Sequence, residues 1–338
     1  KAAIYEAGLR SSPWQHLDDT ATRVNGQNEH CHVVCNPLYT AYFTTAHKDR
    51  LTIVDVLRNL HVRTFRVNAE AISFLYVFGL AQRTVRIVQG LPQDQDLSEA
   101  EFKALLDERL PALGPQQRSH ILEAATVASY HAQLEFPVVK LLLCDDAPQF
   151  NWVTEQLALC WIHEGRHYKK LDPSSPPFRN LLTEFTKQFW KYYDELLTYR
   201  QQPSADEKAR LETKFDTLFA TVTGYRALDE RIEKTKFKKT NLLLVLDHPE
   251  IPLHNNPAEL GARQRVRKRD VSFGPRTHDG ANAWDTFMTL TATAKKLGVS
   301  IYRYIHDRVS GACQMPDLAD LITQRAIELS LGASWEPT

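Results

Sequence analysis

Hydrophobic and polar positions alternate through the first 45 residues in a pattern that predicts three antiparallel strands. Residues 14–24 and 29–35 form two such stretches, and Asn25-Gly26 between them is typical of a two-residue hairpin turn. Asn36-Pro37 marks a second turn, and residues 39–45 after it are rich in aromatic and β-branched side chains. The chain is therefore predicted to begin with a β-meander.

The apolar spacing then changes from that of a strand to that of a helix. Leu51, Val54 and Leu57 recur at helical intervals and predict a helix over residues 50–60. The following stretch, residues 61–133, is mostly helical in its pattern. It lies between two parts of the predicted sheet, so we interpret it as a helical insertion.

Two further strands are predicted from short apolar runs. Residues 137–144 are too apolar to alternate, which is typical of a buried strand, and residues 157–162 form a second run. A short helix is predicted between them, over residues 149–156. The predicted order is three antiparallel strands, a helix, a strand, a helix and a strand. This is the order of a ribonuclease H-like α/β fold with a mixed sheet, and it makes the first strand central and the fourth strand its neighbour.

The second half of the chain is predicted to be mainly helical. Residues 172–177 are a proline-rich break, and residues 178–246 behind it are helical, aromatic and charged, with an interruption at residues 201–204. We divide the chain into a catalytic core that is interrupted by two large α-helical insertions. The segments are 1–60 (core), 61–135 (insertion), 136–171 (core), 172–250 (insertion) and 251–338 (core and C-terminal helices).

The composition limits where a charged partner could bind. Lys+Arg and Asp+Glu both number 41 among 338 residues, so the net charge is zero and any nucleic-acid affinity must come from local patches. Five cysteines form no disulfide-like framework and favour a reducing, cytoplasmic compartment. No apolar run is long enough to cross a membrane. The chain opens with Lys1 rather than Met, so we expect a fragment or a processed form.

Three acidic positions are candidates for metal-dependent chemistry. Asp18 lies inside the first strand, Asp145 ends the fourth strand and is followed by Asp146, and Glu259 lies at the start of a helix. In the predicted fold, acidic residues on the first and fourth strands are adjacent. Three clustered carboxylates are costly to keep ionised without cations. Hard divalent ions such as Mg²⁺ prefer such oxygen ligands, and two of them can promote displacement at phosphorus.

Structural alternatives exist for two of these positions. An Asp pair after a strand is often only a turn, which is the alternative for Asp145 and Asp146. Asn256 is a good N-cap, Pro257 suits the first helical position, and Glu259 would then complete a capping box. Capping and metal binding are compatible, because a capped helix start would fix the direction of the carboxylate.

The helix that begins near Glu259 is strongly basic. Arg263, Arg267 and Lys268 recur at helical spacing, and Arg265 and Arg269 broaden the positive face. A solvated helix normally alternates charge signs, so contact with phosphate is the better interpretation. Two weaker basic stretches, residues 166–170 and 234–239, are more typical of ordinary surface.

These motifs together resemble the catalytic region of bacterial DDE transposases of the insertion-sequence-66 type. Residues 17–20 resemble the family's Asp-Glu-Thr, and residues 144–146 resemble its Asp-Gly-Tyr, although Asp146 departs from that pattern. Residues 160–166 are similar to Cys-Trp-x-His-x-x-Arg, and residues 251–259 are similar to Ile-Pro-x-x-Asn-Asn-x-Ala-Glu. The last block is highly specific, and the resemblance extends over most of the chain.

The resemblance implies roles for individual residues. Asp18, Asp145 and Glu259 would be the metal ligands for two Mg²⁺ or Mn²⁺ ions, and His163 would be a polar helper near the scissile phosphate. We predict that DNA is contacted by Arg166, Asn256, Arg263, Arg265, Arg267, Lys268 and Arg269. The resemblance further implies an amino-terminal DNA-recognition region that this chain lacks. It also implies a homodimer or larger assembly on DNA and a bacterial, nucleoid-associated location in the cytoplasm.

Three functions fit these residues. The first is a transposase that cleaves transposon ends and transfers the freed 3′-hydroxyl to target DNA. The second is a ribonuclease H-like nuclease without strand transfer, and the third is a catalytically silent descendant that binds DNA. All three acidic positions are filled, which argues against the third. Zinc bound by Cys160 and His163, with His167 one turn on, is an alternative without an evident fourth ligand.

Overall fold

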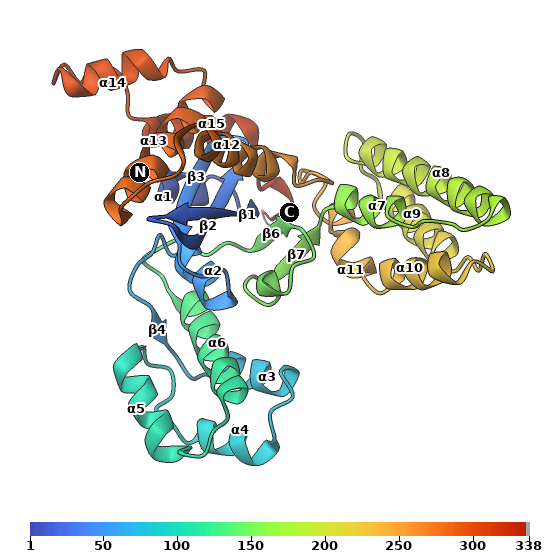
Figure 1. The fold of residues 1–338 in the computed structure, drawn as a ribbon, viewed down its shortest axis with the longest axis horizontal. Coiled ribbons are helices and arrows are strands. Elements are labelled where there is room, and N and C mark those ends of the chain that lie inside the picture. Colours follow the sequence, from blue (N-terminus) through green and yellow to red (C-terminus); the bar gives the residue numbers. More distant parts are fainter. Residues whose placement is uncertain (336–338) are drawn as a thin grey trace.

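The computed structural model describes residues 1–335 and contains a five-stranded sheet with the order β3-β2-β1-β6-β7 (Figure 1). The strands are β1 (Trp14–Val24), β2 (Gln27–Asn36), β3 (Tyr39–Thr45), β6 (Leu141–Cys144) and β7 (Gln156–Leu159). The first three pair antiparallel, whereas β6 lies parallel to β1 and β7 lies parallel to β6. The predicted α/β class is confirmed, and the sheet is consistent with a ribonuclease H-like fold. The first strand is central and the fourth strand is its neighbour, as predicted.

The hairpin between β1 and β2 fixes how these two long strands pair. Asn25 and Gly26 have φ values of 49° and 78°, the left-handed backbone that a mirror-image two-residue turn requires. The turn sets the register so that Asp18 lies opposite Val33. A slip by one residue would move every side chain to the other face of the sheet, so this turn also decides which way Asp18 points.

Helices pack against both faces of the sheet and form two hydrophobic cores. One core joins Leu17, Val34 and Leu142 of the sheet to α1 (Ala2–Arg10), α2 (Arg50–Leu57), α13 (His278–Lys296), α14 (Ile301–Val309) and α15 (Leu318–Leu329). The other core joins Leu141 and Leu143 to α7 (Trp161–Lys169) and to the helices that follow it. Alternate residues of β6 therefore enter opposite cores, as expected for a strand buried on both faces.

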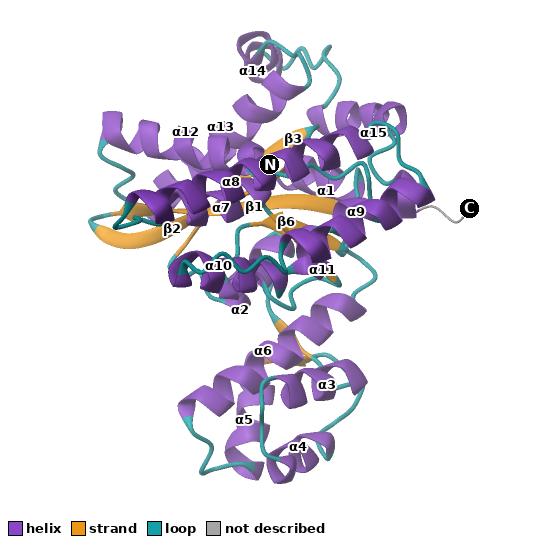
Figure 2. Cartoon of the chain, turned by 90° about the vertical axis from the view of Figure 1, so that its right-hand side faces the viewer, coloured by secondary structure: helices purple, strands orange, loops and turns teal. Residues whose placement is uncertain are grey.

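Two helical insertions extend from the sheet. The first contains α3 (Ala69–Val77), α4 (Gln82–Gln89), α5 (Glu99–Arg109), α6 (Pro115–Ala132) and a small pair of strands, β4 (Thr64–Phe65) and β5 (Leu97–Ser98). It has a hydrophobic core of its own and projects away from the sheet (Figure 2). The second contains α8 (Pro176–Tyr199), α9 (Ala205–Leu218), α10 (Arg226–Lys236) and α11 (Lys239–Leu242) and shares a core with the sheet (Figure 1).

Local signals explain where several of these helices begin. The side chain of Ser98 accepts a hydrogen bond from the Glu101 amide, and Glu101 in turn accepts one from the Ser98 amide, so α5 starts at a capping box. Asn68 and Ser175 cap α3 and α8 in a simpler way, by accepting one backbone hydrogen bond each. Single-turn 3₁₀ helices lie at η1 (Pro148–Phe150), η2 (Leu244–Leu246) and η3 (Ala333–Trp335).

Three predicted elements differ from the structure. The strand predicted over residues 137–144 pairs only from Leu141 onward, and the helix predicted over residues 149–156 is the single turn η1. The last predicted strand ends at Leu159, because α7 begins at Trp161, whose backbone amide bonds the carbonyl oxygen of Leu253 instead of a strand. No helix among residues 1–335 is long and apolar enough to cross a membrane.

Candidate active site

The sheet brings the first two predicted carboxylates to the same edge. His16 of β1 pairs with Leu143 of β6 in parallel register, and Asp18 and Asp145 each follow these positions by two residues. Both side chains are half-buried. β6 ends at Cys144, so Asp145 lies just beyond the paired residues, and its charge acts on Asp18.

The electrostatics of Asp18 reflect this crowding. Burial raises the pKa of its carboxyl group to about 7, and the charges of Asp145 and Glu259 act in the same direction. The Asp19 amide, which donates a hydrogen bond to Asp18 at 2.9 Å, offsets part of the effect. Burial also raises the pKa of Asp145. Both carboxyls are therefore in an environment that disfavours their ionised form unless a positive charge is added.

The third carboxylate is carried by α12 (Asn256–Ser272), which packs across β1 and β2. Gly261 permits the close approach, because a Cβ atom at this position would lie 2.7 Å from Cγ1 of Val33. The hydroxyl of Tyr42 also donates a hydrogen bond to the Gly261 carbonyl oxygen at 3.3 Å. The helix thus lies directly on the strand that pairs with β1.

A buried asparagine fixes the start of α12 to β1. Asn255 is fully buried, and its Nδ2 donates to the carbonyl oxygen of Leu17 at 2.8 Å. Its Oδ1 lies 3.0 Å from Nδ1 of His16, and its backbone amide donates to Sγ of Cys160 at 3.2 Å. Burial lowers the pKa of His16 to about 3, so the ring is neutral and its Nδ1–H donates to Asn255.

The predicted capping box at Glu259 is wrong. The N-cap residue is Asn255 rather than Asn256, and its side chain makes no capping hydrogen bond, because it is used in the contacts to β1. Glu259 is consequently the fourth residue of α12, and its carboxylate is free to point away from the helix start. The capping explanation for this glutamate is therefore removed.

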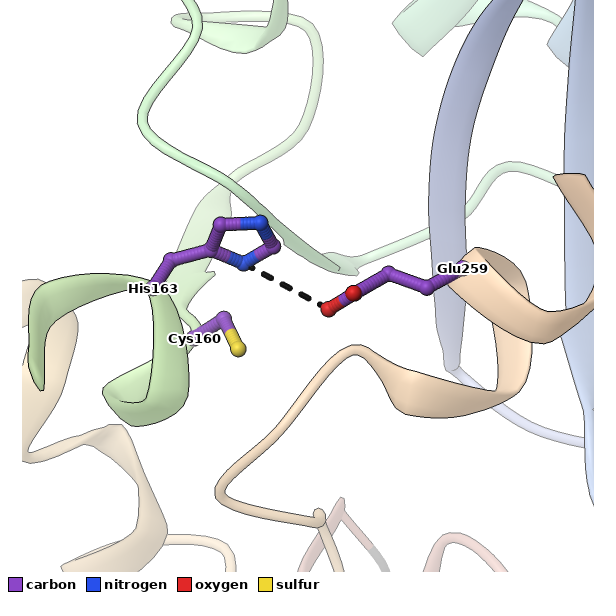
Figure 3. Close-up of side chains that lie close together, drawn as sticks. All are labelled: Cys160, His163 and Glu259. Atoms are coloured by element: carbon purple, nitrogen blue, oxygen red, sulfur yellow. Dashed lines mark ion pairs between the residues drawn. The ribbon is translucent and has the colours of Figure 1, made fainter. Parts of the chain in front are cut away.

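The Glu259 carboxylate faces the helix α7 (Figure 3). Its Oε2 accepts a hydrogen bond from Nη2 of Arg166 at 3.0 Å, and Nη1 of Arg166 lies 3.0 Å from Nε2 of His163. Nδ1 of His163 and Oε1 of Glu259 are 3.6 Å apart. Both of these atoms are buried and have no hydrogen-bond partner among the described residues. An unsatisfied buried carboxylate oxygen is costly, and a cation at this point would satisfy it.

The donor atoms allow two kinds of metal to be compared. Among residues 1–335, the side chains whose donor atoms all lie within 4.8 Å of one another are Cys160, His163 and Glu259. His167 does not belong to this group, so the zinc set considered from the sequence is not assembled. Asp18 and Asp145 also lie outside it, but their raised pKa values and the free oxygen of Glu259 fit hard divalent cations with oxygen ligands.

The basic face of α12 divides into exposed and buried residues. Arg263 and Arg267 are exposed, as is Asn256 at the helix start. Lys268 is half-buried, with its ammonium 4.5 Å from the ring centre of Trp284, and Arg269 donates to the carbonyl oxygen of Ala21 at 2.6 Å. These positions remain predicted DNA contacts.

The prediction that Arg265 contacts DNA is wrong. This side chain is fully buried, and its Nη1 pairs with Oδ1 of Asp285 on α13 at 2.9 Å. Its Nη2 donates to the hydroxyl of Thr44 on β3 at 2.7 Å. Arg265 therefore ties α12 to the sheet and to α13, and its charge is already neutralised inside the protein.

A partly buried ionic network beside the site was not predicted. Lys238, which the sequence suggested to be ordinary surface, bonds Oδ2 of Asp146 at 2.6 Å and Oε2 of Glu164 at 3.0 Å. Glu164 is buried on α7 and also pairs with Arg231 of α10. The loop next to Asp145 is thus linked to the second helical insertion. The only signal in the sequence was the unusual acidic residue at position 146.

Comparisons with known proteins agree with the motifs. A model of the transposase IS66 family matches residues 131–283, a span that contains Asp145, α7 and Glu259. An uncharacterized protein of Sinorhizobium fredii (strain NBRC 101917 / NGR234), y4jO, is 30% identical over 328 residues, which cover 96% of this chain and 100% of the relative. No solved structure matches the chain.

Proposed function

Because this chain belongs to the transposase IS66 family, we propose that it cleaves DNA at transposon ends and joins the freed 3′-hydroxyl to target DNA. One observation carries this proposal. Asp18 lies on β1, Asp145 directly follows the neighbouring parallel strand β6, and Asn255 fixes to β1 the helix that carries Glu259. The charges of Asp145 and Glu259 both act on Asp18, which supports a site formed by these three carboxylates at one edge of the sheet.

Asp18, Asp145 and Glu259 would hold two Mg²⁺ or Mn²⁺ ions. When bound, the ions would activate the attacking hydroxyl and stabilise the leaving oxygen of an in-line displacement at phosphorus. The raised pKa of Asp18 fits this role, because the site as formed by the protein alone has an excess of negative charge. Asn255 would have a positioning role, since it is fully buried and bonds Leu17 of β1 and Cys160, the residue before α7.

His163 and Arg166 would contact the scissile phosphate. In the free protein Arg166 neutralises Glu259 and holds His163 through its second amino group. Arg166 would be free to pair with a phosphate oxygen if cations held by the carboxylates neutralised Glu259 in its place, and its guanidinium fork is well suited to phosphate. Nδ1 of His163 is unpartnered and can contact the same group. Arg263 and Arg267, exposed on α12, would hold the neighbouring backbone phosphates.

Strand transfer requires two transposon ends to be brought together, so we propose that at least two copies of the chain act on DNA as one assembly. The exposed basic residues of α12 lie on the same helix as Glu259, so DNA bound by them would have its backbone near the carboxylates. Light scattering of the protein alone and bound to DNA would measure the number of copies. A single copy per cleaved and joined product would contradict this part of the proposal.

The test is a cleavage and joining assay on end-labelled duplex DNA from the flanks of the protein's own gene, with Mg²⁺ or Mn²⁺ and a plasmid as target. We expect metal-dependent nicks and joined products, both lost in Asp18→Asn and Asp145→Asn while DNA binding persists. Nicks without joined products would favour a nuclease. Binding without cleavage by the wild-type protein would favour a silent DNA-binding descendant.

A further inference from the structure

The far end of α12 presents an aromatic side chain to solvent. Phe273 caps this helix with φ 60° and ψ 12°, a left-handed conformation that costs a residue with a side chain about 1 kcal/mol. It is 91% exposed, more than any other aromatic side chain recorded as exposed in residues 1–335. An exposed apolar side chain buries little surface and therefore stabilises the free protein little. Strained residues of this kind gather at ligand-binding sites.

The turn that carries Phe273 is held rigidly against the β1–β2 hairpin. The Asn25 amide donates to the carbonyl oxygen of Pro275 at 3.0 Å, and Arg269 donates to the carbonyl oxygen of Ala21 at 2.6 Å. Gly274 has φ 86°, and a Cβ atom there would lie 2.9 Å from the carbonyl oxygen of Arg23. The aromatic ring is therefore presented from a fixed backbone, which lowers the entropy cost of stacking a ligand on it.

A hollow of about 570 Å³ lies beside this ring. It is lined by Ala21, Thr22, Arg23, Asn28, Arg269, Asp270 and Phe273. The lining contains two guanidinium groups and one carboxylate, that of Asp270, whose Oδ1 lies 3.6 Å from Nη2 of Arg269. An aromatic face, an amide and an excess of positive charge are the groups that bind a nucleotide of single-stranded DNA, through stacking, base-edge hydrogen bonds and phosphate contact.

The hollow lies at the ends of β1 and α12 that are remote from Asp18 and Glu259. Arg23 follows Asp18 by five residues of β1, or about 17 Å at the rise of a strand. Phe273 follows Glu259 by fourteen positions, or about 21 Å at the rise of a helix. α12 packs along β1, so the two paths run together. Successive nucleotides of duplex DNA rise about 3.4 Å, so this distance spans about five or six positions.

We propose that this hollow binds one unpaired nucleotide of the DNA substrate, with its base stacked on Phe273 and its phosphate held by Arg23 and Arg269. The nucleotide would lie about five or six positions from the scissile phosphate. The proposal rests on the proposed function, because it requires DNA to lie along α12. It adds a site that recognises distorted DNA at a distance from the reacting phosphate.

The site can be tested without knowledge of the transposon ends. The probes are two duplexes of the same sequence, one fully paired and one with a single unpaired 2-aminopurine at its centre. Stacking on an aromatic side chain should make the wild-type protein bind the second duplex about tenfold more tightly. It should also change the fluorescence of the 2-aminopurine, because the base exchanges its neighbouring bases for Phe273. Phe273→Ala should lose both the preference and the fluorescence change, and Phe273→Trp should keep them.

A matched control is Phe237→Ala, which removes a phenylalanine that is 81% exposed at the end of α10, in the second helical insertion. We expect it to behave as the wild type. Equal binding of both duplexes by the wild type, or an unchanged preference in Phe273→Ala, would overturn this site and leave the proposed function standing. Failure of the wild type to bind either duplex would overturn the proposed function, and this site with it.

Discussion

The side-chain amide of Asn255 donates a hydrogen bond of 2.8 Å to the carbonyl oxygen of Leu17, the residue before Asp18. The same side chain accepts from His16, so one buried residue joins the start of α12 to two successive positions of β1. The relative position of Glu259 and Asp18 therefore depends on this buried asparagine.

Asn255→Ala should lower the free energy of unfolding by about 2–4 kcal/mol, because it leaves the buried polar atoms of His16 and Leu17 without partners. Urea denaturation monitored by circular dichroism measures this change. The control is Asn256→Ala at the neighbouring exposed position, where we expect a change within about 0.5 kcal/mol. Equal effects of the two substitutions would show that Asn255 does not anchor the helix.

Glu259→Gln should slow DNA cleavage at least about a hundredfold, since a lost metal ligand removes several kcal/mol of transition-state stabilisation. Stability should change by less than about 1 kcal/mol, because Glu259 makes no capping hydrogen bond. Initial cleavage rates and urea denaturation separate the two effects. Glu184→Gln, on the exposed face of α8, serves as the control for the loss of one carboxylate. A stable Glu259→Gln protein with full activity would exclude Glu259 as a ligand.

The stability of the metal-free protein should fall as pH rises from about 4 to about 7. Burial raises the pKa of Asp18 to about 7, whereas in the unfolded chain this carboxyl titrates near about 3.9. Between these two pH values the carboxyl group of Asp18 is protonated in the native state but ionised in the unfolded state. The free energy of unfolding therefore falls as pH rises, until Asp18 loses its proton in the native state as well. The rise in the pKa of Asp18 corresponds to a change of no more than about 4 kcal/mol in the free energy of unfolding.

Urea denaturation at pH 5 and pH 8, with and without Mg²⁺, measures this dependence. We expect Asp18→Asn to be less sensitive to pH than the wild type, because its side chain does not titrate. Mg²⁺ should stabilise the wild type more at pH 8 than at pH 5, because the ion competes with the proton for Asp18. Identical pH profiles for the two proteins would contradict the raised pKa.

The sheet could be predicted from the sequence because its signals are local. Alternation, the Asn25-Gly26 turn and two apolar runs specify the strands, and the known order of such strands makes Asp18 and Asp145 neighbours. The end of the last strand could not be predicted in this way. Trp161 is fully buried, and a buried apolar residue fits the end of a strand as well as the start of a helix. It starts a helix in the structure, where its backbone amide bonds the carbonyl oxygen of Leu253, which is distant in the sequence.

The candidate site shows the same limit. The sequence identified the basic run on α12 but not which of its arginines faces inward, because the partner of Arg265 is Asp285 on another helix. It identified two adjacent asparagines but assigned the helix start to Asn256, whereas Asn255 is the buried one. Charge and capping patterns are properties of an isolated helix. Which of these residues is buried depends on the elements against which the helix packs.

Lys238→Met should lower the free energy of unfolding by about 1–3 kcal/mol, because Glu164 remains buried with only Arg231 to pair its charge. It should also slow cleavage without weakening DNA binding, since Asp146 beside Asp145 loses its partner. Lys238→Arg should restore part of the rate. The neighbouring Lys239→Met, which breaks an exposed pair with Asp216 and a distant contact with the Phe215 ring, should leave both properties nearly unchanged. An unaltered rate in Lys238→Met would mean that the network does not position the loop.

Arg265 and Arg263 lie two residues apart on α12 and should respond in opposite ways to the same substitution. Arg265→Ala should destabilise the protein by about 3–5 kcal/mol, because it leaves the Asp285 carboxylate buried without its partner. Arg263→Ala should change the free energy of unfolding by less than about 0.5 kcal/mol, because this side chain is exposed. It should weaken DNA binding and reduce by about one the slope of the logarithm of the binding constant against the logarithm of the salt concentration. Urea denaturation and duplex binding at several salt concentrations measure both. If Arg263→Ala left the salt dependence unchanged, the exposed face of α12 would not be the surface that contacts DNA.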